Sequence, residues 1–310
     1  MKKAVFIINP VSGIGRQKEV EKIIRNEMSP NHWETHVIYT KQKGHAHEIA
    51  TDAIDKCDMV VAVGGDGTVN EVGSALIGTA TTLGILPTGS GNGLARYLGM
   101  PFKIPKALQV LNYFERRKID TVKFNDYFSL NVAGVGFDAH ISHKFAKRKK
   151  RGPIAYGQLI TKEFAQYRSE SYMVTINGET QEWDAFLISF ANSSQWGNNV
   201  QIAPFAEIDD GLIDVCFIRD FPKYTAPALL INLLDQSIDR NRYDVIVKAK
   251  NVTIEREIPM LGHVDGEPVL LGNSVNVEIL PLSLNVAIPP KHLRQAQNLL
   301  TPIIELLPEF

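Results

Sequence analysis

Residues 59–76 read MVVAVGGDGTVNEVGSAL, in which a strand pattern changes into a helix pattern across a glycine-rich loop. The first five residues are a continuous apolar run of strand length, and apolar residues recur at helical spacing from Val69 onward. Thr68 and Glu71 have the spacing of a capping box, which predicts that the helix begins directly after Thr68. A strand, a glycine loop and a helix in this order are typical of a parallel α/β sheet.

The rest of the first 119 residues repeats this alternation. Apolar runs of strand length are separated by segments whose apolar residues recur at helical spacing, and the runs are Ala4–Ile8, Val37–Tyr39 and Leu83–Leu86. Each run is apolar throughout, which indicates a parallel sheet covered by helices on both faces. Residues 1–119 are therefore predicted to form one α/β domain.

The pattern changes at Asp120. Residues 120–288 contain short runs rich in β-branched and aromatic residues, separated by turn formers such as Asn177-Gly178. This predicts a second, antiparallel β domain organised as a sandwich, with one helical insertion between His140 and Tyr167. Beyond it, apolar residues in the segment 289–310 predict that the chain returns to pack on the first domain.

The composition of the chain is that of a globular protein. Of its 310 residues 44% are hydrophobic and 22% charged, and the formal net charge is −1. A near-neutral chain lacks the broad positive surface that binds nucleic acid, so we exclude that class. Cys57 and Cys216 have neither metal nor disulfide spacing, and the apolar run Ala4–Ile8 is too short for a signal peptide. No run approaches the roughly 18 apolar residues of a membrane span, so we expect a cytoplasmic protein.

Three glycine-rich loops follow predicted strands. Residues 9–15 read NPVSGIG, residues 63–71 read VGGDGTVNE and residues 87–93 read PTGSGNG. Glycine amides and small hydroxyls bind phosphate oxygens, and a helix N-terminus favours negative charge. Loops that follow parallel strands meet at the carboxyl edge of the sheet, where α/β proteins bind their ligands. The sequence therefore predicts a phosphate-binding site at this edge.

Asp66 lies in the middle of the second loop. Phosphate would repel a carboxylate placed among these amides, unless the carboxylate binds Mg²⁺ or accepts a proton from a hydroxyl. The alternative is that Asp66 is only a turn residue at a strand–helix junction, where glycines are common for conformational reasons. The residues of this loop alone leave both interpretations open.

The three loops resemble those of the family that comprises diacylglycerol kinases, sphingosine kinases and their bacterial relatives, which carry NPxSGxG, GGDGTxNEV and PxGSGN. The resemblance covers almost the whole chain and implies an ATP-dependent lipid kinase, with Mg²⁺ as a cofactor and an active site between a nucleotide domain and a β-sandwich lipid domain. The positions that match nucleotide-binding residues of the family are Asn9, Ser12, Gly13, Thr40, Gly64, Gly65, Asp66, Gly67, Thr68, Asn70, Ser90 and Asn92. For Thr40 the alternative is an ordinary loop threonine.

A second carboxylate motif, Asp265-Gly266-Glu267, lies far downstream of Asp66. Asp-Gly alone is a hairpin signal. The resemblance implies in addition that Glu267 reaches across the active-site cleft as the proton acceptor, because phosphoryl transfer needs a carboxylate near the attacking hydroxyl. Which of Asp66 and Glu267 is the base and which binds Mg²⁺ stays open, and we favour Glu267 as the base.

Two further sites follow from the resemblance. Glu207, Asp210 and the carbonyl of Leu212 match a structural Mg²⁺ or Ca²⁺ site of bacterial members, since hard cations take such oxygen ligands; the alternative is a plain acidic β-turn. Asp138 matches an acidic residue that faces the lipid headgroup, and the alternative is an exposed loop aspartate.

The basic run Lys144–Arg151 reads KFAKRKKR. It is either a solvated helix face or a segment attracted to anionic lipid, at about 1 kcal/mol per basic side chain. The expected partners are thus a lipid substrate and, transiently, an anionic membrane surface, which makes the expected location peripheral at the membrane. The oligomeric state and the lipid acceptor are not defined by the sequence.

Two other functions compete with lipid phosphorylation. NAD kinases and phosphofructokinases also use a Gly-Gly-Asp-Gly loop, so a kinase with a soluble acceptor is one alternative. A non-catalytic nucleotide-binding or lipid-sensing protein is the other, and the presence of both carboxylates disfavours it. The β-rich second half and its Asp-Gly-Glu motif favour a lipid acceptor.

Overall fold

The computed structural model describes residues 1–11, 17–148, 153–197 and 200–294. The first domain contains a parallel sheet in the order β4-β3-β1-β2. Its strands are β1 (Lys2–Ile8), β2 (Trp33–Tyr39), β3 (Met59–Gly64) and β4 (Thr82–Pro87), and its helices are α1 (Gln17–Glu27), α2 (His45–Ala53), α3 (Asp66–Leu76), α4 (Gly93–Tyr97) and α5 (Ile104–Tyr113).

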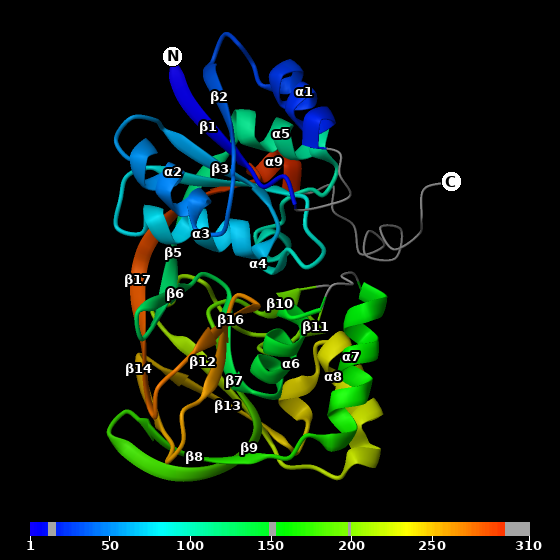
Figure 1. The fold of residues 1–310 in the computed structure, drawn as a ribbon. Coiled ribbons are helices and arrows are strands. Elements are labelled where there is room, and N and C mark those ends of the chain that lie inside the picture. The colour runs from blue at the N-terminus through cyan, green and yellow to red at the C-terminus, as the bar shows by residue number, and fades with distance from the viewer. Residues whose placement is uncertain (12–16, 149–152, 198–199, 295–310) are drawn as a thin grey trace.

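The middle of this sheet is buried on both faces. Every residue of β3 and β4 is buried, which fits their continuously apolar sequences. Helices α1 and α5 pack against each other, as do α2 and α3 (Figure 1). The predicted α/β class of this half of the chain is therefore confirmed.

The second domain consists of antiparallel strands. They are β5 (Glu115–Phe124), β6 (Tyr127–Ser129), β7 (Val132–Gly136), β8 (Glu170–Ile176), β9 (Glu179–Ala191), β12 (Ile213–Arg219), β13 (Asp244–Ala249), β14 (Asn251–Glu255), β15 (Leu261–Val264), β16 (Glu267–Leu270) and β17 (Ser274–Ile288). A separate pair is formed by β10 (Gln195–Gly197) and β11 (Val200–Gln201). The helices that follow α5 are α6 (Phe137–Ala146), α7 (Pro153–Gln166), α8 (Ala226–Leu234) and the short α9 (Lys291–Arg294).

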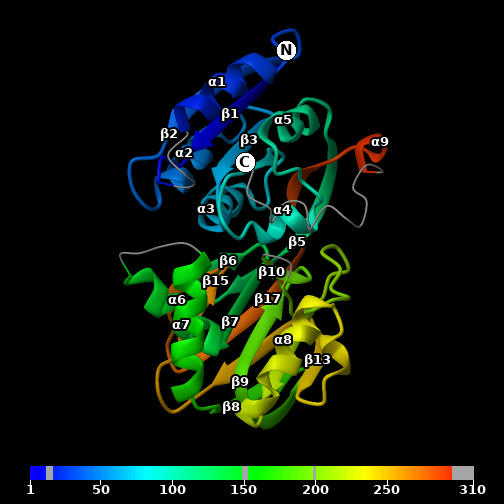
Figure 2. The same ribbon diagram turned by 90° about the vertical axis from the view of Figure 1, so that its right-hand side faces the viewer.

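These strands have two apolar faces. Along β12 the side chains of Val215 and Phe217 enter one core, and those of Cys216 and Ile218 enter another, as the two-residue period of a strand requires. The core that contains Cys216 and Ile218 lies under α6, α7 and α8, and Phe137 packs there on Phe186 with ring centroids 4.6 Å apart. Figure 2 shows α6, α7 and α8 beside the strands of this domain.

Two long strands belong to both domains. The first part of β17 pairs with β14, and its end pairs with β4 at Val286 and Leu83 (Figure 1). Strand β5 runs antiparallel beside it, so the predicted boundary after residue 119 falls inside β5. There the side chains change from the core of the first domain (Ile119) to the core that contains Val215 (Val122).

The predicted return of the chain to the first domain is confirmed for the described residues. From the predicted segment 289–310, Leu293 packs against the core of the first domain. The return begins earlier than predicted, because Leu284, Val286 and Ile288 at the end of β17 already belong to that core. The remainder of the predicted returning segment, 295–310, lies outside the described residues.

Candidate active site

The Gly-Gly-Asp-Gly loop passes directly from β3 into α3. The helix begins at Asp66, so the prediction that it begins after Thr68 was wrong. The carboxylate of Glu71 does not bond back to its own helix; it accepts the N–H groups of Gly44 (2.9 Å) and Ala46 (3.1 Å) at the start of α2. Glu71 therefore caps the neighbouring helix, because those two amides lack intrahelical partners.

Asp66 joins the second loop to the third. Its Oδ2 accepts the N–H of Asn92 and its Oδ1 accepts the N–H of Gly93, both at 2.8 Å. These amides belong to the first turn of α4, so the carboxylate caps that helix from outside. Burial raises the pKa of Asp66 to about 6, with a smaller raising effect of Asp265, while the two amides act in the opposite direction. Asp66 therefore links the second loop to the third as well as being a candidate for chemistry, so it is more than a turn residue.

The same two loops touch at a pair of glycines. A Cβ on Gly89 would lie 2.3 Å from the Cα of Gly65, which no side chain tolerates. The N–H of Thr88 also donates to the carbonyl of Gly64 at 3.0 Å. A Cβ on Gly64 would lie 2.4 Å from Oγ1 of Thr68. The glycines are required here because backbones and a buried hydroxyl approach so closely.

The first loop contacts the second through Asn9. Its Nδ2 donates to Oγ1 of Thr68 at 3.1 Å, and its backbone N–H donates to the carbonyl of Val63. Thr40 is buried directly after β2, and its N–H donates to the carbonyl of Ile8 at 2.9 Å. The described parts of the loops are therefore assembled at one edge of the sheet, as predicted.

The remaining predicted nucleotide residues occupy different environments. Ser90 is exposed, whereas Asn92 is buried in a left-handed conformation (φ 55°) and donates to the carbonyl of Gly89 at 2.6 Å. The amide of Asn70 donates to Oδ2 of Asp265 (2.8 Å) and to the carbonyl of Phe128 (2.7 Å), both in the second domain. Ser12 and Gly13 lie outside the described residues.

Glu267 comes from the second domain to the same place. It begins β16 after the turn Asp265-Gly266, where both residues have positive φ, so the predicted hairpin is confirmed. Its side chain lies over Gly67: a Cβ on that glycine would be 3.0 Å from Oε1 of Glu267. The Nζ of Lys43 donates to Oε2 of Glu267 at 2.9 Å. Glu267 of the second domain therefore lies over the residue that follows Asp66 of the first.

Asp265 is a residue whose role the sequence did not reveal. It is buried, and its two oxygens accept five hydrogen bonds of 2.6–3.1 Å; the donors are the Ser129 hydroxyl, the Asn70 amide and the N–H groups of Leu130, Asn131 and Val132. Asn70 belongs to α3 and the other donors run from the end of β6 to the start of β7, so Asp265 connects the Glu267 turn to both domains. An Asp-Gly pair predicts only a turn. No local pattern in the sequence could therefore have predicted that Asp265 contacts both domains.

Asp138 is not an exposed loop residue, so that alternative was wrong. It is the second residue of α6 and half-buried, and its Oδ2 contacts Nε2 of His263 at 2.9 Å and the hydroxyl of Ser189 at 3.1 Å. Nδ1 of the buried His263 accepts the N–H of Gly266 at 3.4 Å. With Nδ1 as acceptor, Nε2 carries the proton and donates to Asp138. Asp138 therefore supports the turn that presents Glu267.

The acidic loop predicted to hold a structural metal contains a salt bridge. Oδ2 of Asp210 accepts from Nζ of Lys248 at 2.6 Å, and Asp214 lies 3.6 Å from the same nitrogen. Oδ1 of Asp210 accepts the N–H of Leu212, while Glu207 is exposed. Within the residues that the structure describes, no group of three or more His, Cys, Asp or Glu side chains is arranged to hold a metal ion. A lysine thus balances the charge where a cation was predicted.

The basic run divides into parts with different contacts. Nζ of Lys144 donates to the carboxylate of Glu163 at 2.5 Å, and His140 contacts the same oxygen at 3.0 Å. Lys144 and His140 hold the pKa of Glu163 at about 2, well below its usual range. Lys144 and Lys147 are both exposed, and Lys144 pairs with a carboxylate of the fold. Residues 149–151 lie outside the described part of the chain.

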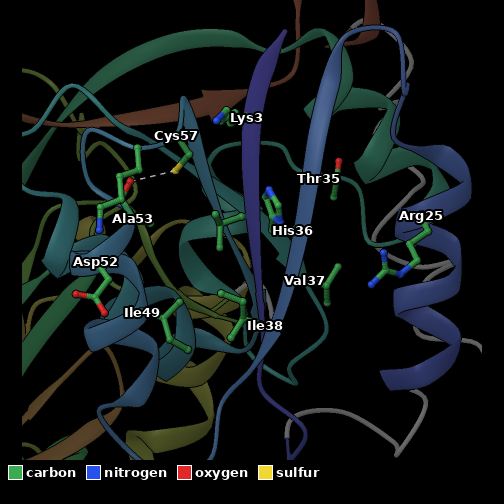
Figure 3. Close-up of a pocket in the computed structure, with 12 residues that line it drawn as sticks. Lys3, Arg25, Thr35, His36, Val37, Ile38, Ile49, Asp52, Ala53 and Cys57 are labelled. Carbon is green, nitrogen blue, oxygen red and sulfur yellow. Dashed lines mark hydrogen bonds between the residues drawn. The ribbon is translucent and has the colours of Figure 1, made fainter.

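A hollow beside the edge strand β2 is separate from this site. It is lined from β1, β2, α1 and the end of α2, and Figure 3 shows Arg25, His36, Asp52 and Cys57 around it. None of the site residues predicted from the sequence lines this hollow. In the described part of the chain no helix is long and apolar enough to cross a membrane.

Comparison with known families divides the chain as its fold does. Residues 3–124 match the diacylglycerol kinase catalytic domain, and residues 131–288 match the YegS C-terminal NAD kinase beta sandwich-like domain. A probable lipid kinase YegS-like of Klebsiella pneumoniae (strain 342) is 31% identical over 261 residues, which cover 82% of this chain and 86% of the relative. The corresponding protein of Citrobacter koseri is 33% identical over 270 residues, with 83% and 87% covered.

Solved structures superpose on nearly the whole chain. A putative diacylglycerol kinase from Bacillus anthracis superposes with a TM-score of 0.79 at 25% identity, covering 93% of this chain and 96% of that one. Yeast NADH kinase superposes with a TM-score of 0.57 at 13% identity, covering 98% and 87%. The second likeness concerns the fold alone.

Proposed function

This chain belongs to the YegS family of probable lipid kinases, in which a diacylglycerol kinase catalytic domain is followed by a beta sandwich-like domain, and we propose that it transfers the γ-phosphoryl group of ATP to the hydroxyl group of a membrane lipid. One observation carries the proposal. The carboxylate of Glu267, from the second domain, lies over Gly67 beside Asp66 of the first. Phosphoryl transfer to a hydroxyl requires a carboxylate base close to the phosphate site.

The phosphates of ATP bind to the glycine loops. The amides of residues 64–67 and the N-terminus of the 11-residue helix α3 favour negative charge. Asp66 holds the third loop against the second, so both loops act as one preformed surface. Preformed donors of this kind stabilise charge without reorganising during the reaction.

The donor set fits Mg²⁺, which kinase sites bind through one or two carboxylates and the substrate phosphates. Asp66 is the residue that would hold it, because each of its oxygens keeps a lone pair beyond the single amide hydrogen bond that it accepts. When bound with ATP, the ion supplies positive charge to the phosphate oxygens.

Glu267 acts as the general base. Its side chain is half exposed, so an acceptor hydroxyl can reach it, whereas the neighbouring Asp265 is buried and fully hydrogen-bonded. The hydroxyl proton passes to Glu267 as the hydroxyl oxygen bonds to the γ-phosphorus and the bond to the ADP oxygen breaks. His263 and Asp138 hold the turn that presents this carboxylate, and Asp138 also takes part in binding the lipid headgroup.

The lipid is reached by transient binding to an anionic membrane surface. The exposed Lys147 belongs to the basic run Lys144–Arg151, and each basic side chain near such a surface contributes about 1 kcal/mol before salt screening. Replacing residues 147–150 with Gln is expected to lower activity on anionic vesicles far more than activity on a short-chain soluble lipid. Equal loss on both substrates would contradict membrane docking through this run.

The proposal is tested with γ-labelled ATP and a panel of acceptors. Diacylglycerol, a sphingoid base and other lipid alcohols are presented in mixed micelles, and NAD⁺ is the soluble acceptor suggested by the shared fold of yeast NADH kinase. We expect label on at least one lipid and none on NAD⁺. Label on NAD⁺ alone would make the chain a kinase with a soluble acceptor.

A further inference from the structure

Lys43 lies outside the three glycine loops and forms an ion pair with a residue of the second domain. It lies on the connection between β2 and α2, and its Nζ donates to Oε2 of Glu267 at 2.9 Å. Its backbone is held in place, because Glu71 of α3 accepts the N–H groups of the next residue, Gly44, and of Ala46. Lys43 is thus anchored to the helix that begins with Asp66.

Lys43 and Glu267 can each exchange this ion pair for another partner, because both side chains are exposed. The side chain of Lys43 is 75% exposed and that of Glu267 is 51% exposed. Water screens a pair this exposed, so it contributes little to the stability of the fold. The ammonium also occupies Oε2, one of the two oxygens with which Glu267 would accept the proton of a hydroxyl. Release of this contact leaves both oxygens of Glu267 to the acceptor hydroxyl.

The charge around the phosphate site provides a reason for the release. The described residues of the three loops, 9–11, 64–70 and 87–93, include no Lys or Arg. Asp66 and Glu267 instead bring two carboxylates to a place where the triphosphate adds further negative charge. Enzymes that transfer phosphoryl groups commonly place a lysine on the β- and γ-phosphates, and Lys43 is in contact with this site.

We propose that Lys43 is a phosphate-binding residue that exchanges Glu267 for the phosphates of ATP. This inference rests on the proposed function and adds a residue to the same site. When ATP binds, the ammonium bonds to the terminal phosphate oxygens and leaves Oε2 of Glu267 to the acceptor hydroxyl. Lys43 keeps its own protons throughout: the hydroxyl proton goes to Glu267, the oxygen–phosphorus bond forms, and ADP leaves with the electrons of the broken bond.

Direct binding measurements on the full chain test the proposal without any lipid. Lys43→Gln is expected to weaken ATP binding at least tenfold, which corresponds to about 1.4 kcal/mol, and to change adenosine binding less than twofold. Lys43→Arg should restore most of the affinity, because it restores the charge. Lys41→Gln is the matched control, since Lys41 is an exposed lysine on the same loop, and it should bind ATP as the wild type does.

A double variant separates phosphate binding from support of Glu267. If Lys43 binds phosphate, Lys43→Gln weakens ATP binding at least as strongly in a Glu267→Gln background, where no carboxylate competes for the ammonium. Disappearance of the effect in that background would overturn the proposal, as would unchanged ATP affinity of a folded Lys43→Gln protein or an equal loss for adenosine. A wild-type chain that binds no ATP would overturn the proposed function itself, and this inference with it.

Discussion

Replacing Asp66 with asparagine removes one charge at the junction of two loops and leaves the shape of the side chain unchanged. The carboxylate accepts one N–H on each oxygen, at 2.8 Å each. Asparagine keeps one acceptor and turns an NH₂ group toward the other N–H, so one hydrogen bond to a charged group is lost, at a cost of about 1.5–3 kcal/mol.

The lost bond is offset by relief of burial. The pKa of Asp66 rises from an ordinary value of 3.8 to about 6 because burial disfavours the ionised form. At about 1.4 kcal/mol for each tenfold change in the proton equilibrium, this corresponds to about 3 kcal/mol that the neutral amide does not lose. Because this net shift already includes the two amide hydrogen bonds, neutralising the side chain is not expected to destabilise the fold, and Asp66→Asn should melt at or slightly above the melting temperature of the wild type.

Turnover should respond very differently. Loss of this carboxylate is expected to lower lipid phosphorylation at least about a hundredfold, the scale of a lost acid–base or electrostatic group. Circular dichroism melting and label transfer from ATP to lipid measure the two properties on one preparation. Asp58→Asn is the matched control, because Asp58 accepts the N–H of Lys3 on the surface of the same domain, and it should retain full activity. Near wild-type turnover by a folded Asp66→Asn protein would refute the role of this residue.

Three further outcomes are expected. Glu267→Gln should leave the dissociation constant of ATP within a few fold while kcat falls sharply; a loss confined to ATP affinity would reassign this residue to the nucleotide. Gly89→Ala should destabilise the protein by about 1–3 kcal/mol and abolish ATP binding in calorimetry, because its Cβ would lie 2.3 Å from the Cα of Gly65, whereas Gly157→Ala, with open space around its Cβ, should be tolerated. Activity should fall as the pH drops through about 6, where Asp66 gains a proton. The contribution of Asp66 to the free energy of unfolding is full below about pH 4 and is lost as the pH rises through 6. A stability difference between wild type and Asp66→Asn that does not vary between pH 4 and 7 would contradict this.

Patterns local in the sequence predicted the elements that local physics controls. The apolar run at Met59–Val63 became the fully buried β3, and the Asp-Gly pair before Glu267 became a hairpin turn. The glycine loops were predicted to meet because parallel strands end at one edge, and the contact of Gly65 with Gly89 agrees with this.

The errors concern side chains whose partners are distant in sequence. The Thr68–Glu71 pair has the spacing of a capping box, yet the Glu71 carboxylate finds unpaired amides at the start of α2. Lys144 of the basic run is exposed, as in the solvated interpretation, but it also pairs with the buried Glu163. In each case a three-dimensional neighbour decides which partner the charge takes, and no spacing rule encodes that neighbour.

The contacts that support the turn before Glu267 could not be predicted from the sequence either. Asp265 gathers donors from Asn70 and from the segment around Leu130, and His263 contacts Asp138 over a separation of 125 residues. Each of these residues has an ordinary local interpretation as a turn or core residue. Their connection arises only because the β15–β16 hairpin lies beside β7.

The central claim is that Asp66 and Glu267 together direct the γ-phosphoryl group of ATP to a lipid hydroxyl. It is tested most directly by following γ-³²P from ATP into the chloroform-extractable product with the wild type, Asp66→Asn and Glu267→Gln in parallel. We predict label in the lipid phase for the wild type and at least about a hundredfold less for each variant. Equal lipid labelling by either folded variant, or wild-type label confined to the aqueous phase, would contradict the claim.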